Sequence, residues 1–167
     1  MNGRVHFIGI GGIGISALAR LLLDRGCTVS GTEDNESPET LSSLREQDVA
    51  ISLDLEPSYL PPADYYVYSD AWLTKHEAVL AEARTRGVPV LSYFEALGQI
   101  ARDYKVVAVA GTHGKTTTTA MLIDIFEAAG LDPVGVVGSL RATTQSNYRA
   151  GKGEYFIVEA DEYRRHF

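Results

Sequence analysis

The sequence contains very little cysteine and no long apolar run, and each absence argues against a class of protein. Cys27 is the single cysteine among 167 residues, so no disulfide can form within the chain and a reducing compartment is indicated. We expect Cys27 to be a small buried apolar residue. No apolar segment approaches the roughly 20 residues that span a bilayer, and residues 1–4 lack the features of a signal peptide. The sequence therefore predicts a cytoplasmic protein without membrane insertion.

Positive charge is also scarce. The chain has 15 Lys and Arg against 22 Asp and Glu, which gives a net charge of −7. Such a balance offers no general attraction for nucleic acid or for an anionic membrane, so any phosphate must be bound locally. No repeat or low-complexity tract is present, and 45% of the residues are hydrophobic, which is enough for one good core and part of a second.

Short apolar runs alternate with segments of helical period, a pattern typical of a parallel sheet with helices on both faces. The pattern restarts after about residue 103, so we predict an α/β protein with one domain over residues 1–102 and the beginning of another over residues 103–167. Expected strands are residues 5–8, 28–31, 50–53, 65–69, 88–91, 106–110, 134–137 and 155–159. Expected helices begin near residues 13 and 38, cover residues 75–86 and 93–102, and follow residue 116.

Two expectations concern the second domain in particular. In its helix, the apolar residues Met121, Leu122, Ile125, Phe126 and Ala129 are expected to form one buried face. Residues 139–153 are polar and contain glycine, which favours a surface loop.

The first expected strand runs into a glycine-rich turn over residues 9–14. Gly9, Gly11 and Gly14 satisfy G-x-G-x-x-G between a strand and a helix, which is the context that the motif requires. Glycine lets the backbone approach a pyrophosphate, whose charge the helix N-terminus stabilises. A tight turn with close packing is the alternative, but four glycines in six residues exceed what it needs. We therefore predict a Rossmann-like domain. Glu33, at the end of the second strand, taken alone favours NAD, because an acid there meets a ribose hydroxyl.

A second phosphate-binding turn follows the strand over residues 106–110. Gly114, Lys115 and Thr116 form the G-K-[ST] core of a Walker A loop, although Val109 stands where the usual pattern has its first glycine. Lys115 can neutralise the β- and γ-phosphates, and the Thr116 hydroxyl can bind Mg²⁺. The second domain is thus predicted to be the start of a P-loop NTPase α/β domain. His113 is left open as either a substrate contact or a simple loop residue.

An acidic run, residues 159–162, follows the last expected strand. Ligands of open α/β sheets gather at the carboxyl ends of the strands, so Glu159 is expected to face the same crevice as the P-loop and to bind Mg²⁺. A solvated acidic turn is the alternative.

These two turns in tandem, with these residues, resemble the Mur ligases of peptidoglycan synthesis. The blocks that carry the resemblance are HFIGIGGIGIS at residues 6–16, VSG at 29–31, SDA at 69–71, AGTHGKTTT at 110–118 and EADE at 159–162. Two segments depart from the family pattern: Gly31-Thr32-Glu33 stand where the family usually has Gly-Ser-Asp, and Tyr163-Arg164 replace the commoner Ser-Asp.

The resemblance implies a role for each loop. The first domain would bind the uridine diphosphate of UDP-N-acetylmuramic acid, and the second would bind ATP and Mg²⁺. Substrate-binding residues would be Gly11, Gly12, Ile13, Gly14, Ser16, Glu33 and Ser69. ATP-binding residues would be Gly111, Thr112, His113, Gly114, Lys115, Thr116 and Thr117. Thr116 and Glu159 would bind the metal, with Lys115 and Glu159 as the catalytic residues.

The family reaction explains why two phosphate sites are needed. ATP phosphorylates the lactyl carboxylate of the sugar, and an amino group attacks the acyl phosphate, which yields an amide, ADP and phosphate. The glycine loop is most similar to members that add L-alanine. The EADEY sequence also occurs in members that join a tripeptide to the same sugar nucleotide, which is the first alternative; an NAD-binding oxidoreductase or sensor is the second. We expect the 167 residues to be the opening part of a longer ligase and to bind substrate without catalysis.

Overall fold

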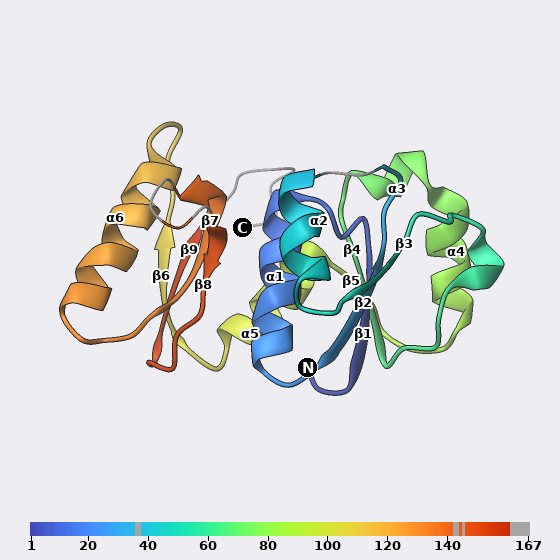
Figure 1. Cartoon of the computed structure of the whole chain (residues 1–167), viewed down its shortest axis with the longest axis horizontal. Coiled ribbons are helices and arrows are strands. Elements are labelled where there is room, and N and C mark those ends of the chain that lie inside the picture. Colours follow the sequence, from blue (N-terminus) through green and yellow to red (C-terminus); the bar gives the residue numbers. More distant parts are fainter. Residues whose placement is uncertain (36–37, 142–143, 145, 161–167) are drawn as a thin grey trace. The chain divides into compact units, whose positions relative to one another are not determined.

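The computed structural model describes residues 1–35, 38–141, 144 and 146–160. The chain divides into two compact units, Met1–Leu97 and Gly98–Phe167, each built around its own sheet (Figure 1). The division falls within helix α5 (Tyr93–Ala101). The expected α/β class with a parallel sheet is confirmed.

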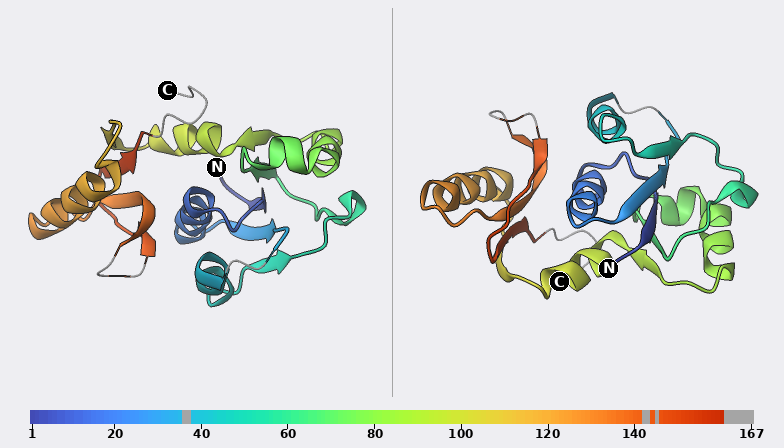
Figure 2. Two further views of the ribbon diagram at one scale, coloured as in Figure 1. Left: turned by 90° about the horizontal axis from the view of Figure 1, so that it is seen from above. Right: turned by 60° about the horizontal axis from the view of Figure 1, so that its bottom comes forward.

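The first unit is a doubly wound sheet in which all strands run parallel, in the order β3-β2-β1-β4-β5. Helices α1 (Ile13–Asp24) and α2 (Pro38–Arg45) cover one face, and α4 (Glu77–Thr85) covers part of the other (Figures 1 and 2). The strands are β1 (Arg4–Ile8), β2 (Thr28–Thr32), β3 (Ala50–Ser52), β4 (Tyr65–Tyr68) and β5 (Val90–Ser92). The central strand β1 is buried from Val5 to Ile8, as expected of a strand covered on both faces.

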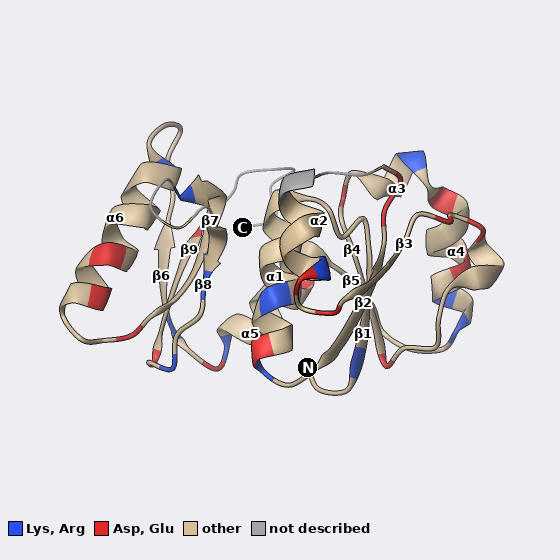
Figure 3. Ribbon diagram, viewed as in Figure 1, with Lys and Arg blue, Asp and Glu red and all other residues tan. Residues whose placement is uncertain are grey.

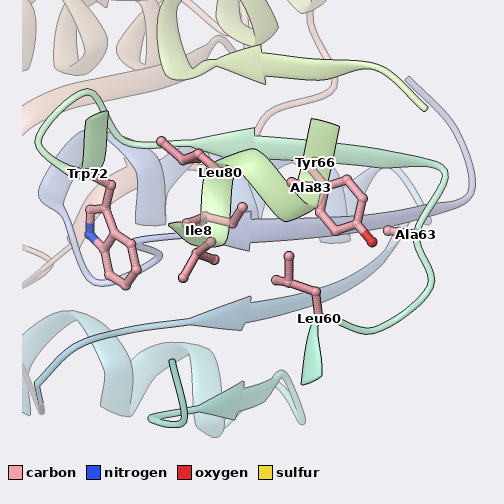
Figure 4. Close-up of a cluster of buried hydrophobic side chains, with 8 residues drawn as sticks. Ile8, Leu60, Ala63, Tyr66, Trp72, Leu80 and Ala83 are labelled. Atoms are coloured by element: carbon pink, nitrogen blue, oxygen red, sulfur yellow. The ribbon is translucent and has the colours of Figure 1, made fainter. Parts of the chain in front are cut away.

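Apolar side chains between the sheet and α4 form the core of one face. Ile8 of β1, Tyr66 of β4 and Leu80 of α4 are each almost fully buried, and Trp72 packs at the left end of the same cluster in Figure 4. Burial of such side chains stabilises a fold by about 1.5–3 kcal/mol each. This cluster fixes the position of the loops that follow β1 and β4.

The expected helix over residues 75–86 is interrupted in the structure. A short helix α3 (Trp72–Lys75) precedes α4, and His76 between them is not helical. The ring of His76 lies 4.1 Å from the ring of Trp72, and its Nε2 lies 3.0 Å from an Asp34 carboxylate oxygen. These tertiary contacts break the helix where the apolar period alone predicts continuity. The last strand of this sheet begins at Val90, two residues later than expected.

The second unit has a sheet of order β6-β9-β7-β8, in which only β8 is antiparallel to its neighbour. Its strands are β6 (Lys105–Val109), β7 (Val134–Arg141), β8 (Ser146–Arg149) and β9 (Tyr155–Glu159). Helix α6 (Lys115–Ala128) follows β6 directly and packs on the sheet through Ile123, which contacts Val137 and Ile157 in the core.

The buried face expected for this helix is wrong. Met121 and Ile125 are 58% and 57% exposed, whereas Thr119 and Ile123 are fully buried. Leu122 and Phe126 are partly buried beside Ile123. The row with Met121 and Ile125 and the row with Thr119 and Ile123 both recur with the helical period, and only the position of the sheet decides which row is covered.

The surface loop expected over residues 139–153 is also wrong. Strand β7 continues to Arg141, and β8 returns along it. The polar side chains of this hairpin are buried with partners: the Ser146 hydroxyl donates to the Tyr148 carbonyl at 2.6 Å, and Arg141 forms an ion pair with Asp124. Polar composition therefore misled the prediction, because these groups are satisfied inside the fold.

Acidic and basic residues are interspersed over the helices and loops of both units (Figure 3). Among the described residues, no helix is both long enough and apolar enough to cross a membrane. Cys27 is a free, buried cysteine, as expected.

Candidate functional site

The first glycine loop joins β1 to α1. Gly9 has a φ of +81°, and a Cβ at this position would lie 2.3 Å from Trp72 Nε1, so only glycine fits. The backbone amides of Gly9 and Ile10 donate to the Thr32 carbonyl oxygen at 2.8 and 3.2 Å. The loop is therefore tied to the end of β2, and the amide of Gly11 is left to point toward the residues that follow β2.

The Glu33 side chain is hydrogen-bonded to the Gly11 amide, which a phosphate ligand would use. Its Oε2 accepts a hydrogen bond from the Gly11 amide at 2.6 Å, and its Oε1 accepts one from the Asp34 amide at 2.9 Å. The side chain is buried, and burial raises its pKa above the ordinary value, against the effect of the two amides. A Cβ on Gly11 would lie 2.6 Å from Glu33 Oε2. The loop thus already holds an anionic group by a backbone amide.

A cavity of about 260 Å³ opens beside this loop. It brings together the sequence-predicted residues Gly11, Gly12, Glu33 and Ser69. Ser69 reaches the cavity because β4 is paired with β1 and the Ser69 amide donates to the Ile8 carbonyl at 3.0 Å. This is the edge of a parallel sheet where ligands of doubly wound folds bind.

The other predicted residues of this loop lie in the first turn of α1. Ile13 is 41% exposed, and Ser16 is buried, with its hydroxyl donating to the Ile13 carbonyl at 2.9 Å. Gly14 faces Tyr93, whose hydroxyl would lie 3.0 Å from an added Cβ. These three residues shape the start of the helix behind the cavity.

Sequence reasoning missed a charged cluster at the same cavity. Asp34 forms an ion pair with Lys75, and its Oδ2 also contacts His76 Nε2 at 3.0 Å. Contact with Lys75 is the main cause that holds the pKa of Asp34 well below its usual range. Asp34, Lys75 and Trp72 all line the cavity. Because Asp34 follows β2 and Lys75 ends α3, 41 residues further on, no local motif joins them.

The second glycine loop joins β6 to α6. Gly111 and Gly114 have φ values of +146° and +76°, and Gly114 caps the helix that begins at Lys115. The Lys115 ammonium turns back over the loop and donates to the Gly111 carbonyl at 2.8 Å. The side chains of Thr112 and His113 are exposed. The turn therefore has two glycines with positive φ and a lysine that returns over it, and its assignment as a P-loop stays a prediction.

Glu159 stands beside this loop because β6 and β9 are paired with Val109 opposite Glu159. Its Oε2 accepts a hydrogen bond from the Thr116 hydroxyl at 3.2 Å. The structure therefore brings together the two residues predicted to bind a metal. Thr117 is exposed on the first turn of the helix. Asp161 and Glu162, from the same acidic run, lie outside the described residues.

Gly138 of β7 is a further residue that sequence reasoning missed. Its amide donates to Glu159 Oε1 at 2.6 Å, and a Cβ on it would lie 2.8 Å from Glu159 Oε2. A glycine inside a strand that marks a close approach is the available signal. Within the described residues, no three His, Cys, Asp or Glu side chains gather at one point. Thr116 and Glu159 suit Mg²⁺, which usually takes few protein ligands and completes its shell with phosphate and water oxygens.

Comparison with known proteins gives consistent matches. The family model described as Mur ligase family, catalytic domain, matches residues 4–105. The UDP-N-acetylmuramate–L-alanine ligase of Salinispora arenicola is 46% identical over 165 residues, which are 99% of this chain and 32% of that protein. The protein of the same name from Chlorobium phaeobacteroides is 39% identical over 98% of this chain and 35% of its own length. The chain spans about a third of the length of these curated relatives.

Solved structures agree with these relatives. A UDP-N-acetylmuramate-alanine ligase from Thermotoga maritima superposes with a TM-score of 0.84 at 29% identity, covering 95% of this chain and 37% of that one. A UDP-N-acetylmuramate:L-alanyl-gamma-D-glutamyl-meso-diaminopimelate ligase from Neisseria meningitides superposes with a TM-score of 0.86 at 29% identity, covering 98% and 54%. The fold is similar to both kinds of ligase.

Proposed function

The chain belongs to the Mur ligase family, and from this premise we propose that it is part of an ATP-dependent ligase that joins L-alanine to UDP-N-acetylmuramic acid. The product is a peptidoglycan precursor, and the cytoplasm is the expected location. The observation that carries the proposal is the presence of two glycine loops, each between a strand and a helix and one in each unit, with a threonine and a glutamate paired at the second. A ligase of this class needs both a nucleotide sugar and a nucleoside triphosphate.

In the first unit, the diphosphate of the sugar nucleotide is proposed to bind at the amides of Gly11, Gly12, Ile13 and Gly14. The Gly11 amide already donates a hydrogen bond to the Glu33 carboxylate, which supports its use for a phosphate oxygen. The ligand must then displace that carboxylate, and Glu33 and Ser69 are left to contact the nucleoside. Ser16, which is buried, supports the loop from inside the helix.

In the second unit, ATP is proposed to bind along residues 111–117. Lys115 would leave the Gly111 carbonyl for the β- and γ-phosphates, and His113 would lie along the triphosphate. Mg²⁺ would be held by Thr116 and Glu159, whose oxygens are 3.2 Å apart, and would supply charge neutralisation during phosphoryl transfer. Gly138 keeps the Glu159 carboxylate turned toward this position.

The proposed reaction has two steps. A lactyl carboxylate oxygen attacks the γ-phosphorus of ATP, and ADP leaves as the acyl phosphate forms. The amino group of L-alanine then attacks the carbonyl carbon, the amine loses a proton, and phosphate leaves. Lys115 stabilises the negative charge that develops on the transferred phosphoryl group. No side-chain nucleophile is needed.

A second candidate is a ligase that adds a tripeptide to the same sugar nucleotide. The TM-score of 0.86 with the structure of such an enzyme supports it. The identity of 46% with an alanine-adding relative favours L-alanine. The amino substrate that turns over in a protein carrying this chain separates the two candidates.

Binding to the chain itself tests the nucleotide-sugar assignment. In a thermal-shift measurement, we expect UDP-N-acetylmuramic acid to raise the melting temperature of the first unit and NADH to leave it unchanged. Stabilisation follows because a ligand that binds only the folded state shifts the unfolding equilibrium. Stabilisation by NADH alone would instead assign the first loop to an oxidoreductase or sensor.

A further inference from the structure

A second cavity lies on the face of the first sheet that α4 partly covers, and none of the residues of the first glycine loop lines it. The connection from β3 to β4, residues 53–64, contains only one short turn of helix, η1 (Pro57–Tyr59), where crossovers between parallel strands usually have a full helix. Figures 1 and 2 show this connection running beside α4. Because no helix covers β2 and β3 on this face, a cavity of about 370 Å³ remains beneath the connection. This is within the size range of small-molecule sites.

The floor of the cavity is formed by three hydrogen-bonded side chains, His6, Ser30 and Thr32, which we call the relay. His6 is 1% exposed, and its Nδ1 and Nε2 lie 2.9 and 2.8 Å from the hydroxyls of Ser30 and Thr32. Burial lowers the pKa of His6 to about 4, so the ring is neutral at pH 7. A neutral imidazole has one N–H and one lone pair, so one hydroxyl accepts from the ring and the other donates to it.

The relay therefore has unused hydrogen-bonding capacity. The accepting hydroxyl keeps its own proton, and the donating hydroxyl keeps its lone pairs. Ser30 and Thr32 both line the cavity, so the floor offers one donor and one acceptor to a ligand. A phenol or similar hydroxyl can satisfy both at once.

The walls are apolar and the mouth is acidic. Leu55, Tyr59 and Val79 provide apolar surface, and Tyr59 is 67% exposed at the connection. Asp54 and Glu56 are the charged lining residues at the mouth, and no Lys or Arg lines this cavity in the described part of the chain. The cavity beside the glycine loop, in contrast, contains Lys75. An anionic ligand is disfavoured here, and a cationic group at the mouth is favoured.

We propose that this cavity is a binding site for a small aromatic amine that carries a ring hydroxyl. The ring packs on Leu55 and Val79, the hydroxyl bonds to the relay of Ser30 and Thr32, and the ammonium lies at Asp54 and Glu56. None of the residues that line this cavity lines the cavity beside the first glycine loop, and the proposal does not depend on the assignment of that loop.

Tyramine is a suitable probe, followed by amide chemical shifts in NMR titrations of the chain. We expect saturable shifts at Ser30, Thr32 and Leu55, with no shifts at Gly11 and Gly12. 4-Hydroxyphenylacetate has the same ring with a carboxylate in place of the ammonium, and we expect it to bind at least tenfold more weakly. Equal binding of the two probes, or shifts confined to the glycine loop, would overturn the proposal, as would the absence of saturable shifts.

Two pairs of variants separate the relay from the fold. Thr32→Val removes the hydroxyl and should weaken tyramine about three- to tenfold, the value of one neutral hydrogen bond, while Thr32→Ser should keep binding near that of the parent. Asp54→Asn should weaken tyramine up to about fivefold, while Glu46→Gln, in the turn after α2, should change it less than twofold. Equal affinity in Thr32→Val and Thr32→Ser would contradict the role of the relay.

Discussion

Substitution of Gly9 by alanine is expected to destabilise the first unit through two separable effects. Gly9 has a φ of +81°, which costs a residue with a Cβ about 1 kcal/mol. The new Cβ would also lie 2.3 Å from Nε1 and 2.5 Å from Cδ1 of the buried Trp72. Moving a packed side chain to make room costs about 1–3 kcal/mol more. The free energy of unfolding should therefore fall by roughly 2–4 kcal/mol, the sum of these two terms.

Gly26 provides a matched control. It has a φ of +82°, and a Cβ there would have no atom within 4 Å. Gly26→Ala should therefore lose only the backbone term of about 1 kcal/mol. Urea unfolding can be followed by fluorescence, because Trp72 is the single tryptophan of the chain and lies in the site itself. Equal destabilisation by the two substitutions would refute the claim that Trp72 fixes the glycine at position 9.

Four further outcomes follow from the contacts of the two sites and of the buried histidine. Lys115→Ala should abolish binding of Mg·ATP and leave the affinity for UDP-N-acetylmuramic acid within about twofold, as measured by isothermal titration, since the two loops belong to different units; loss of sugar-nucleotide binding would contradict this. Glu159→Gln should remove most of the Mg²⁺ dependence of ATP binding, and an unchanged dependence would assign the metal to other ligands. The pKa of His6 is lowered to about 4 by burial, so between pH 6.5 and 4 the unfolded chain takes up a proton and the folded chain does not. As the pH falls through this range, the free energy of unfolding should fall by about 1.4 kcal/mol per pH unit. The fall should be less steep in His6→Gln. The pKa of Asp34 is lowered, mainly by Lys75, so Asp34 stabilises the folded state above the unfolded pKa of about 3.9, and this stabilisation is lost as the pH falls below that value. Asp34→Asn should therefore lose less stability than the parent between pH 5 and 3. An identical loss would argue against the ion pair.

Most of the strands and both glycine loops could be predicted because their signals are local. A buried strand, a run of glycines and a helix start lie within about fifteen residues in each case, and the structure has β1 followed by α1 and β6 followed by α6. The contact between Thr116 and Glu159 could also be predicted, because the carboxyl ends of parallel strands lie at one edge of a sheet.

The remaining features depend on contacts between distant parts of the chain. The ion pair of Asp34 with Lys75 joins residues 41 positions apart in the sequence, and Asp34 also contacts His76, where the helix is broken. The covered side of α6 is decided by the sheet, which buries Ile123 and leaves Met121 exposed. Hairpin β7–β8 has a polar composition that resembles a loop until its partners are known.

The central claim is that the two loops bind different phosphates independently. Amide chemical shifts in NMR spectra of the chain test it directly, because each loop has glycine amides of its own. UDP-N-acetylmuramic acid should shift the amides of Gly11 and Gly12 alone, and Mg·ATP should shift those of Gly111 and Gly114 alone, whether or not the other ligand is present. Displacement of one ligand by the other from a single loop would contradict the account.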